Sequence, residues 1–351
     1  MTPDTPLRTA LEQLAAGHSL SADEAAAAFD VLMRGEATGV QAAALLMALR
    51  AKGETDQELA GAAIALRRAM VRLELEDGEA VVDTCGTGGG RVGTLNLSTA
   101  AAFVVAGAGT RVAKHGNRSF TSRSGSADVL EALGVEIGLA PERAPAVLEA
   151  AGLVFLFAPT YHPAMRHVAA VRRELAVPTI MNLLGPLVNP AGVRRQVIGV
   201  ADPLRAPLVA GALARLGACH ALVLHAEIGM DEVSPCGSTA VWEVREGTVE
   251  CWSLDPAAYG LGCEDLDGLA GGEPAENADR IETLLTGRGA RAARCAVLLN
   301  AAAALYVSGR AWSMAEAVER AEEALESGAA LSALERLRQA APRGSGVGAS
   351  P

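Results

Sequence analysis

The chain has 351 residues, half of them apolar, and carries a formal net charge of −11. A chain of this length and composition can bury the cores of two domains, or of one large α/β domain that carries a helical one. The excess of negative charge disfavours non-specific binding to nucleic acid or to a membrane surface, so a local cluster of basic and polar groups must bind any anionic ligand.

The sequence also predicts a cytoplasmic protein without a membrane anchor. No apolar run approaches the ~20 residues that a membrane span needs, and the first residues do not form the basic and apolar segments of a signal peptide. The six cysteines lack a C-x-x-C or zinc-type spacing, which is typical of a reducing compartment and of a chain without a disulfide framework.

The first 75 residues predict a small helical domain. Apolar side chains recur at helical spacing from 5 to 72. Two capping boxes, Ser21 with Glu24 and Thr55 with Glu58, mark the starts of helices within this stretch.

From about residue 80, short apolar segments alternate with helical patterns. Strands are predicted near 80–84, 111–114, 153–157, 196–201 and 220–226, followed by a hairpin over 242–252 that turns at Glu246-Gly247. Helices are predicted near 98–107, 126–133, 142–151, 163–175 and 204–217, and Ala-rich helices fill 277–340. The alternation predicts an α/β fold with a central, mostly parallel sheet flanked by helices, whose ligands bind beyond the carboxyl ends of the strands. We expect this domain over 76–340 and a disordered tail over 341–351.

A glycine-rich stretch, CGTGGGRVGTLNLST at residues 85–99, follows the first predicted strand. Glycine lets backbone N–H groups approach a phosphate closely, but it also forms tight turns, and the glycines alone favour neither reading. Arg91 occupies the place of the third glycine of a dinucleotide-binding fingerprint, and no Gly-Lys-Ser/Thr follows as in a P-loop. A second feature must therefore decide between a turn and a phosphate site.

A second polar stretch, KHGNRSFTSRSGSAD at residues 114–128, also follows a short predicted strand. Almost no large apolar residue interrupts its cations and hydroxyl groups, and Ser124-Gly125-Ser126 lies where the next helix begins. The stretch is either a solvated loop or part of an anion site. Two such loops after neighbouring strands fit a ligand with two separated phosphate groups.

An arginine on the helical pattern over 161–175 is predicted to point inward. Arg172 shares the apolar side of this helix with Met165 and Val168, whereas Arg166 falls on another side. A buried guanidinium must meet a carboxylate, which is either a structural Asp or Glu or a group that the ligand brings.

Adjacent Asp231 and Glu232 follow the strand that is predicted near 220–226. Alone, an acidic pair in a glycine-flanked loop is usually a solvated turn. Mg²⁺, however, favours one or two carboxylates together with water and substrate phosphate oxygens. Beside two phosphate-type loops, the pair therefore predicts a magnesium site.

Taken together, these segments resemble the anthranilate phosphoribosyltransferase family of tryptophan biosynthesis. The resemblance runs in order from the N-terminal helices to about residue 340. Its seven blocks are GTGG at 86–89, NLST at 96–99, KHGNR at 114–118, SGSAD at 124–128, HPAM at 162–165, NLLGPL at 182–187 and GMDE at 229–232. Seven blocks in register are far more specific than one glycine loop.

The resemblance implies a fold and a reaction. The fold, shared with pyrimidine nucleoside phosphorylases, is a small helical domain, joined in space by about residues 165–190 and hinged to a large α/β domain. The reaction transfers the 5-phosphoribosyl group of 5-phosphoribosyl 1-pyrophosphate to the amine of anthranilate, and gives N-(5-phosphoribosyl)anthranilate and pyrophosphate. A homodimer through the helical domain and one or two Mg²⁺ ions are also implied.

The site residues follow from the resemblance, position by position. The phosphoribosyl donor would be bound by Gly86, Gly89, Thr94, Asn96, Ser98, Thr99, Lys114, Asn117, Arg118, Ser119, Ser122 and Ser126. The substrate-binding residues would also include Gly90, Leu97 and Gly116. Ser98, Asp231 and Glu232 would bind Mg²⁺, and anthranilate would contact Gly86, Asn117 and Arg172, with His115, His162 and Pro186 along its path. Lys114, Asn117 and Arg172 are the expected catalytic residues, which act by positioning and electrostatics without an obligatory general base.

Two positions depart from the family pattern. Gly90 stands where relatives commonly have an aspartate after Gly-Thr-Gly-Gly, so we expect weaker or differently ordered Mg²⁺ binding that relies on Asp231 and Glu232. The run Pro-Thr-Ile-Met-Asn at 178–182 replaces the usual Arg-Thr-Ile-Phe-Asn. We expect the loss of that arginine to affect the hinge or the anthranilate channel and to leave the core motifs intact.

Two alternatives stay open on the sequence. A pyrimidine nucleoside phosphorylase of the same fold needs one phosphate and a nucleobase, whereas this chain offers an acidic pair for a metal-bound pyrophosphate and an inward Arg172. A non-catalytic homologue that binds nucleic acid is disfavoured by the negative charge and by an aromatic content of 3%.

Overall fold

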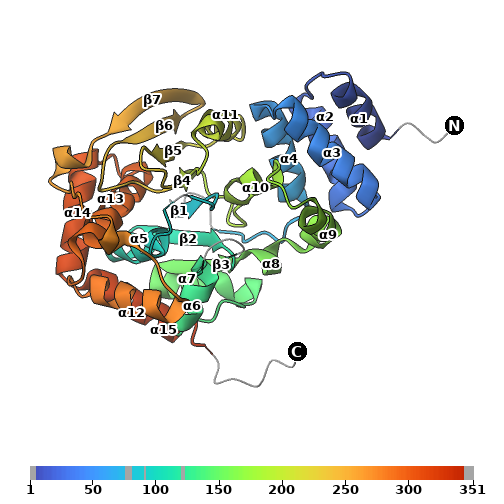
Figure 1. Cartoon of the computed structure of the whole chain (residues 1–351). Coiled ribbons are helices and arrows are strands. Elements are labelled where there is room, and N and C mark those ends of the chain that lie inside the picture. Colours follow the sequence, from blue (N-terminus) through green and yellow to red (C-terminus); the bar gives the residue numbers. More distant parts are fainter. Residues whose placement is uncertain (1–4, 76–80, 91, 120–122, 344–351) are drawn as a thin grey trace.

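The computed structural model describes residues 5–75, 81–90, 92–119 and 123–343. Its N-terminal part is a bundle of the helices α1 (Pro6–Ala15), α2 (Ala22–Met33), α3 (Gly39–Lys52) and α4 (Asp56–Ala69), set to one side of the sheet (Figure 1). Both predicted capping boxes are present, at Ser21 and Thr55, and each satisfies N–H groups that a helix start leaves without a partner. The helices α2 and α4 therefore begin where the sequence predicts.

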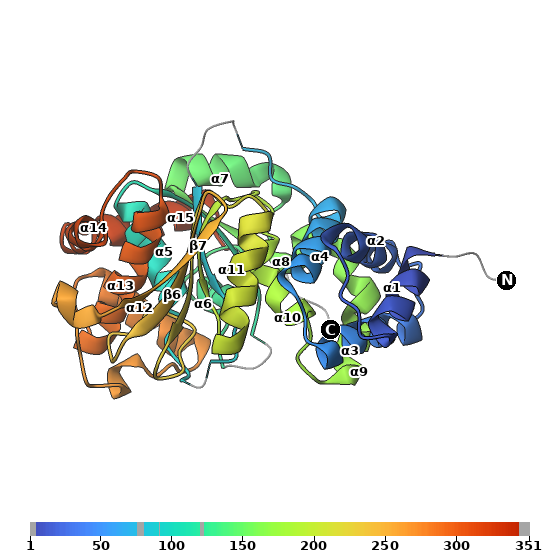
Figure 2. The ribbon, with the colours of Figure 1, turned by 90° about the horizontal axis from the view of Figure 1, so that it is seen from above.

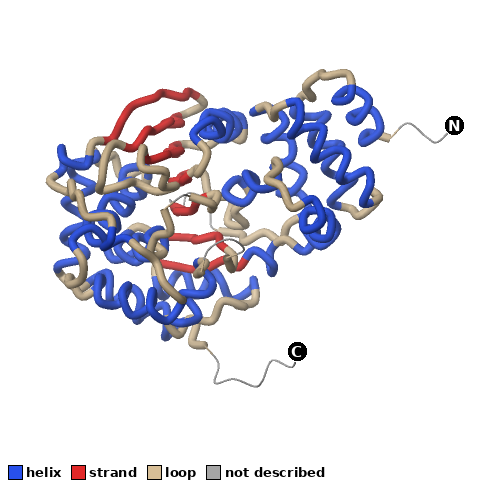
Figure 3. The backbone as a smooth tube through the Cα atoms, viewed as in Figure 1, coloured by secondary structure: helices blue, strands red, loops and turns tan. Residues whose placement is uncertain are grey.

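In the described part of the chain, seven strands form one sheet in the order β3-β2-β1-β4-β5-β6-β7. Figure 3 shows the strands in red, with helices around them in blue. The strands are β1 (Val81–Gly86), β2 (Arg111–Gly116), β3 (Leu153–Phe157), β4 (Arg195–Gly199), β5 (His220–Ala226), β6 (Thr239–Arg245) and β7 (Thr248–Leu254). The strands β1 to β5 pair in parallel, and β6 and β7 add the predicted antiparallel hairpin. Its turn residues Glu246 and Gly247 have φ of 48° and 86°, the left-handed conformation that a two-residue hairpin turn requires.

Helices cover both faces of the sheet, as the alternating pattern predicts. The helices α5 (Leu97–Gly107) and α13 (Arg291–Val307) pack on one face, and α11 (Ala206–Arg215) lies between the other face and the bundle (Figure 2). The α/β part also contains α6 (Ser126–Ala132), α7 (Ala144–Ala151), α12 (Pro274–Leu285), α14 (Met314–Glu326) and α15 (Ala329–Ala340). Within the described residues, none of the helices combines the length and the apolar content that crossing a bilayer requires. The strand order reverses between β1 and β4, the point at which open α/β sheets bind their ligands.

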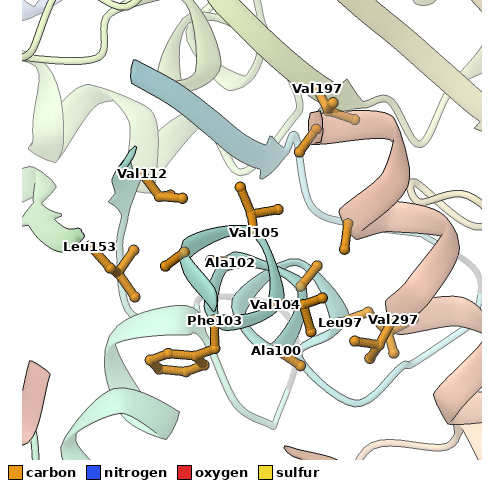
Figure 4. Close-up of a cluster of buried hydrophobic side chains, with 14 of the residues drawn as sticks. Leu97, Ala100, Ala102, Phe103, Val104, Val105, Val112, Leu153, Val197 and Val297 are labelled. Carbon is orange, nitrogen blue, oxygen red and sulfur yellow. The ribbon is translucent and has the colours of Figure 1, made fainter. Parts of the chain in front are cut away.

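The core of the α/β part is built around α5, which is buried on nearly every side. Leu97 and Phe103 are fully buried, and Figure 4 shows them in one cluster with Val112 of β2 and Val297 of α13. A helix that is apolar all round cannot face water, so α5 is fixed between the sheet and the C-terminal helices. Its first turn, which carries Ser98, is thereby held near the carboxyl end of β1.

Between β3 and β4 the chain returns to the bundle, through α8 (Ala158–Tyr161), α9 (Arg166–Leu175) and α10 (Met181–Leu184). Val168, Ile180 and Leu184 are buried in the same core cluster as the bundle helices. This cluster continues through α11 into one face of β4 and β5. The bundle is thus joined to the sheet by apolar packing, and the expected domain boundaries at 75 and 340 stay a prediction.

The end of the chain differs from the predicted tail over 341–351. Pro342 forms a bridge with Val135, and the N–H of Arg343 donates to Gly134 O at 3.1 Å. Backbone pairing therefore holds residues 341–343, although their composition is typical of a loop. Residues 344–351 lie outside the described part of the chain.

A group of hydrogen-bond donors surrounds Glu243 of β6 on the sheet. Its carboxylate accepts from His220 Nε2 at 2.7 Å, from Tyr306 OH at 3.0 Å and from Trp252 Nε1 at 2.8 Å. Burial opposes the ionisation of this carboxyl, but the hydrogen bonds from His220, Tyr306 and Trp252 outweigh it and lower the pKa of Glu243 to about 2. The cluster ties β5, β6, β7 and α13 together.

We predict that Glu243 makes folding stability depend on pH in the acid range. Because its pKa in the folded state lies below the ordinary value of 4.5, the ionised carboxylate stabilises the fold above that pH, and the contribution is lost as the pH falls toward 2. Glu243→Gln should therefore cost about 2–3 kcal/mol at neutral pH and progressively less in acid. Urea unfolding of both proteins from neutral pH to about pH 3 measures the difference. A constant difference over that range would contradict the prediction.

Candidate active site

A cavity of about 830 Å³ opens at the carboxyl ends of β1, β4 and β5, where the strand order reverses. Its walls come from the glycine-rich stretch after β1, from residues 123–126 and from the acidic pair after β5. Asn277 of α12 and Asn300 of α13 also line it. Segments far apart in the sequence therefore meet at the place that the sheet topology favours for a ligand.

The carboxylate of Asp231 lies in a cradle of glycines. A Cβ on Gly86 or Gly90 would come within 2.7 Å of a carboxylate oxygen of Asp231, and a Cβ on Gly199 would come within 1.5 Å of its main-chain oxygen. The N–H of Gly88 donates to Asp231 Oδ2 at 3.1 Å. Glycine is required at the ends of β1 and β4 because a side chain there would displace the acidic loop.

Glu232, the second acid of the pair, contacts the start of α5. Its carboxylate accepts hydrogen bonds from Thr94 Oγ1 at 2.7 Å and from Ser98 N at 3.3 Å. Burial, and then the charge of Asp231, raise the pKa of Glu232 to about 8, and burial also raises the pKa of Asp231. Two adjacent carboxylates whose charged forms are opposed in this way are stabilised by a bound cation.

Lys114 of β2 is almost fully buried and reaches β1 and α5. Its Nζ donates to Thr84 O at 2.5 Å and to Ser98 Oγ at 3.1 Å. Burial lowers the pKa of Lys114 and raises the pKa of the fully buried Asp83, while the attraction between the two charges opposes both shifts. Lys114 therefore orients the Ser98 hydroxyl.

The donor set fits a divalent cation that shares its ligands with a bound phosphate. Ionised together, Asp83, Asp231 and Glu232 exceed the charge of Lys114 by two. In the ranges that the structure describes, no three His, Cys, Asp or Glu side chains are grouped as a complete metal site. Mg²⁺ needs only one or two carboxylates when water and substrate phosphate complete its shell. Asp231, Glu232 and the nearby Ser98 hydroxyl are the groups that could hold it.

The polar loop after β2 is tied to α6. The Arg118 guanidinium pairs with Asp128 at 2.8 Å and with Glu131 at 2.6 Å, and its Cζ lies 5.9 Å from the centre of the Phe157 ring. Asp128 also accepts a hydrogen bond from the N–H of Ser119 at 3.1 Å. Both ion pairs are made by Nη1, so they hold Arg118 against α6, and a ligand would bind through Nε or Nη2 or replace these pairs.

Asn96, near the end of the glycine-rich stretch, belongs to a network with α12. Its Oδ1 accepts from Ser124 Oγ at 3.1 Å and from Asn277 Nδ2 at 2.9 Å, and its Nδ2 donates to Ser124 O at 3.0 Å. Asn277 is 1% exposed and accepts from Gly272 N at 2.8 Å. The network joins the two stretches that the sequence singles out as phosphate loops.

His115 and His162 connect β2 with the segment that returns to the bundle. Their Nε2 atoms are 3.2 Å apart, and His115 Nδ1 lies 3.2 Å from Gly185 O. Burial, and then the charge of His162, lower the pKa of His115 to about 3, and burial lowers the pKa of His162 to about 4. Both rings are therefore neutral near pH 7. Pro186, which directly follows Gly185, is buried, and its main-chain oxygen accepts from Gln196 Nε2 at 3.0 Å.

Arg172 lies on α9, four residues after Val168, which is 1% exposed. As predicted, Arg172 is half-buried, whereas Arg166 and Arg173 are exposed. Burial lowers the pKa of Arg172, and within the described ranges no carboxylate pairs with it. A desolvated guanidinium without a partner is unfavourable, so this arginine suits a carboxylate that arrives with a ligand.

The structure brings part of the predicted site together around the cavity. Its lining includes Gly86, Gly89, Gly90, Thr94, Asn96, Ser98, Ser126, Asp231 and Glu232. Other predicted residues in the described ranges lie outside this lining, namely Lys114, His115, Gly116, Asn117, Arg118, Ser119, His162, Arg172 and Pro186. The side chains of Leu97 and Thr99 are buried in α5, and Ser122 lies outside the described residues.

Sequence reasoning missed Gly199, Asn277 and Asn300. Gly199 ends β4, and nothing in the local sequence shows that Asp231 packs against its backbone. The two asparagines lie within helical patterns, and Asn300 interrupts an otherwise apolar run in α13. A polar residue in a buried helix needs hydrogen-bond partners, and that requirement is the one local signal for Asn300.

Comparisons with known proteins cover nearly the whole chain. Residues 8–70 match a family model described as "Glycosyl transferase family, helical bundle domain", and residues 78–331 match "Glycosyl transferase family, a/b domain". The anthranilate phosphoribosyltransferase of Rubrobacter xylanophilus is 52% identical, over 98% of this chain and 100% of the relative. That of Thermomicrobium roseum is 52% identical, over 93% of this chain and 95% of the relative.

Solved structures show the same similarity. The crystal structure of anthranilate phosphoribosyltransferase from Thermus thermophilus superposes with a TM-score of 0.89 at 45% identity, over 94% of this chain and 98% of that one. The enzyme from Saccharomyces cerevisiae, in complex with PRPP and Mg, gives a TM-score of 0.87 at 29% identity, over 95% and 97% of the two chains. The resemblance predicted from the sequence is confirmed, and the chain belongs to the anthranilate phosphoribosyltransferase family.

Proposed function

We propose that this chain transfers the 5-phosphoribosyl group of 5-phosphoribosyl 1-pyrophosphate to the amine of anthranilate and releases pyrophosphate. The observation that carries the proposal is the acidic pair Asp231 and Glu232, placed with the glycine-rich stretch at the switch point of the sheet. The relatives named above support it, because they share nearly the whole length of the chain. The yeast relative is described in complex with PRPP and Mg.

The donor would occupy the cavity beside the glycine-rich stretch. The backbone N–H groups of Gly89 and Gly90 would offer hydrogen bonds to phosphate oxygens, and the hydroxyls of Ser98 and Ser126 line the same cavity. Mg²⁺, held by Asp231 and Glu232, would supply positive charge where the leaving pyrophosphate gains negative charge. Lys114 keeps Ser98 in place, because its ammonium donates to the Ser98 hydroxyl. The expected number of Mg²⁺ ions, one or two, rests on the family resemblance.

The acceptor would meet the opposite side of the site. The carboxylate of anthranilate provides the partner that Arg172 lacks within the described residues, by a charge-assisted hydrogen bond. His115 and His162 are neutral, so they offer a polar but uncharged wall along the path to the ribose. An aryl amine is nucleophilic when neutral, so positioning and electrostatics are enough for catalysis. A yeast relative is described in complex with 4-fluoroanthranilate.

The homodimer through the bundle and the cytoplasmic location also belong to the proposal. The homodimer rests on the resemblance, and the location rests on the composition of the chain. Analytical ultracentrifugation of the purified chain tests the first of these.

The proposed reaction predicts a loss of anthranilate fluorescence that requires both the donor and Mg²⁺. Replacing Asp231 and Glu232 together by Asn and Gln should remove most of this activity along with its Mg²⁺ dependence, because the two carboxylates are the cation ligands. A stopped assay for pyrophosphate checks that donor is consumed in equal amount. The absence of turnover at every Mg²⁺ concentration would refute the function, and retained activity in the double variant would refute the ligand assignment.

Arg172→Ala should raise KM for anthranilate about 10- to 100-fold, the range expected for one lost hydrogen bond between charged groups. KM for 5-phosphoribosyl 1-pyrophosphate should change much less. Arg173→Ala is the matched control, because Arg173 lies next to Arg172 on α9 and is exposed. Steady-state kinetics with each substrate varied in turn gives both constants. Equal increases in the two KM values would show that Arg172 has a structural role.

We predict that Gly90→Ala and Gly90→Asp differ in how far Mg²⁺ stabilises them. The φ of Gly90 lies outside the left-handed region, so the contact with Asp231 is what limits a side chain there. We expect Gly90→Ala and Gly90→Asp each to destabilise the metal-free protein by about 1–3 kcal/mol, because the new Cβ crowds the Asp231 carboxylate. Mg²⁺ should restore the Asp variant more than the Ala variant, because the added carboxylate is a further cation ligand. Thermal unfolding in EDTA and in saturating Mg²⁺ measures both effects. Equal Mg²⁺-induced shifts in Tm would contradict the expectation.

A further inference from the structure

Asn300 of α13 pairs with the backbone of the acidic loop. Its Oδ1 accepts from Val233 N at 3.0 Å, and its Nδ2 donates to Val233 O at 2.9 Å. Val233 directly follows Asp231 and Glu232, and both Val233 and Asn300 are buried. The side-chain amide thus fixes both polar groups of one peptide residue, which sets the orientation of the chain that carries the carboxylates.

Asn300 has little capacity left for a ligand of its own. Its Nδ2 also donates to Ala296 O at 2.8 Å, so both hydrogens of the amide are used. Although Asn300 lines the cavity, its bonds are made to the protein. Its effect on a ligand must therefore pass through Val233 and the two acids before it.

The helix that carries Asn300 also holds the opposite wall of the metal site. One turn before Asn300, Val297 packs beside Leu97 of α5 (Figure 4). Leu97 directly precedes Ser98, whose N–H donates to Glu232 Oε1 at 3.3 Å. One rigid helix therefore contacts both the acidic loop and the turn that bears Ser98.

The rest of the loop is fixed on its far side. Ser234 N donates to Thr239 Oγ1 at 3.2 Å, and Cys236 N donates to Ser234 Oγ at 2.9 Å. Toward the sheet, Gly199 leaves room for the main chain of Asp231. Between these two fixed parts, the pairing with Asn300 holds the peptide next to Glu232.

We propose that Asn300 is a positioning residue for the metal and pyrophosphate site, and that it acts by fixing Val233 so that the Glu232 carboxylate stays in register with Ser98. The inference rests on the proposed function, because it assigns a cation to Asp231 and Glu232. A chain whose acidic loop is free to shift would still fold around α13, but it would bind the cation weakly. Residues that orient metal ligands commonly account for a 10- to 100-fold change in affinity.

The test compares Mn²⁺ binding by three variants of the full chain in the presence of 5-phosphoribosyl 1-pyrophosphate. Asn300→Leu keeps the volume of the side chain and removes its hydrogen bonds. Asn300→Ser is a milder second variant, because its hydroxyl can still bond Ala296 O but is too short to reach Val233. Val307→Ala weakens the far end of the same helix, away from the cavity lining, and leaves the Asn300 amide intact, so it controls for loss of stability.

Electron paramagnetic resonance of free Mn²⁺ gives the dissociation constant without relying on activity. We expect both Asn300 variants to bind Mn²⁺ about 10-fold or more weakly than wild type, while Val307→Ala stays within about 3-fold. The Mg²⁺ concentration for half-maximal activity should rise in parallel, and kcat at saturating Mg²⁺ should fall less.

Two outcomes separate this inference from the proposed function. Wild-type affinity for Mn²⁺ in either folded Asn300 variant, or an equal loss in Val307→Ala, would overturn the positioning role and leave the reaction untouched. A wild-type chain that binds Mn²⁺ but never consumes anthranilate would overturn the reaction, and the Mn²⁺ comparison would still decide the role of Asn300.

Discussion

The structure depends on placing two adjacent carboxylates, Asp231 and Glu232, at the wall of a cavity where solvent cannot fully stabilise them. A partly buried acid pair is unfavourable unless hydrogen bonds and a cation offset the loss of hydration. The fold supplies hydrogen bonds to the carboxylates from the glycine-rich stretch after β1 and from the start of α5, and α13 fixes the main chain of Val233, the next residue. A bound cation would supply the rest of the stabilisation that the two carboxylates need. The glycine at residue 199 has the same cause. The main chain of Asp231 packs directly against the end of β4, and a side chain there would push the two acids away from the cavity wall.

The proposed acceptor site also contains a charge without a complete partner, but here the charge is positive. Arg172 is desolvated and lacks a carboxylate partner within the described residues. His115 and His162, which connect β2 with the segment that carries Arg172, are kept neutral by burial. A ligand pair that brings a metal-bound pyrophosphate on one side and a carboxylate on the other would therefore complete both regions, whereas a neutral nucleobase would leave the arginine unpaired.

Much of the fold could be predicted from the sequence because the signals were local. Apolar periodicity located the strands, capping boxes located α2 and α4, and glycine beside Glu246 located the hairpin. The acidic pair and the glycine-rich stretch were also found locally. Asn277 and Asn300 were not, since their partners Asn96 and Val233 lie 181 and 67 residues away in the sequence. The ion pairs of Arg118 with Asp128 and Glu131 of α6 could not be predicted either, because a sequence motif gives residue types and not side-chain contacts.

Gly90 shows how the sequence and the structure give one position different meanings. Compared with the family pattern, residue 90 lacks the usual aspartate, and the loss of a carboxylate suggests a weaker metal site. In the structure the same glycine provides clearance, because a Cβ there would come within 2.7 Å of Asp231 Oδ1. A relative with aspartate at this place must set either the glycine-rich stretch or the acidic loop differently, since two carboxylates cannot share that space without a cation between them. The absence of a side chain at residue 90 and the close seating of Asp231 are therefore one structural fact, and in the proposed site the acidic loop alone, through Asp231 and Glu232, would supply carboxylates to the cation.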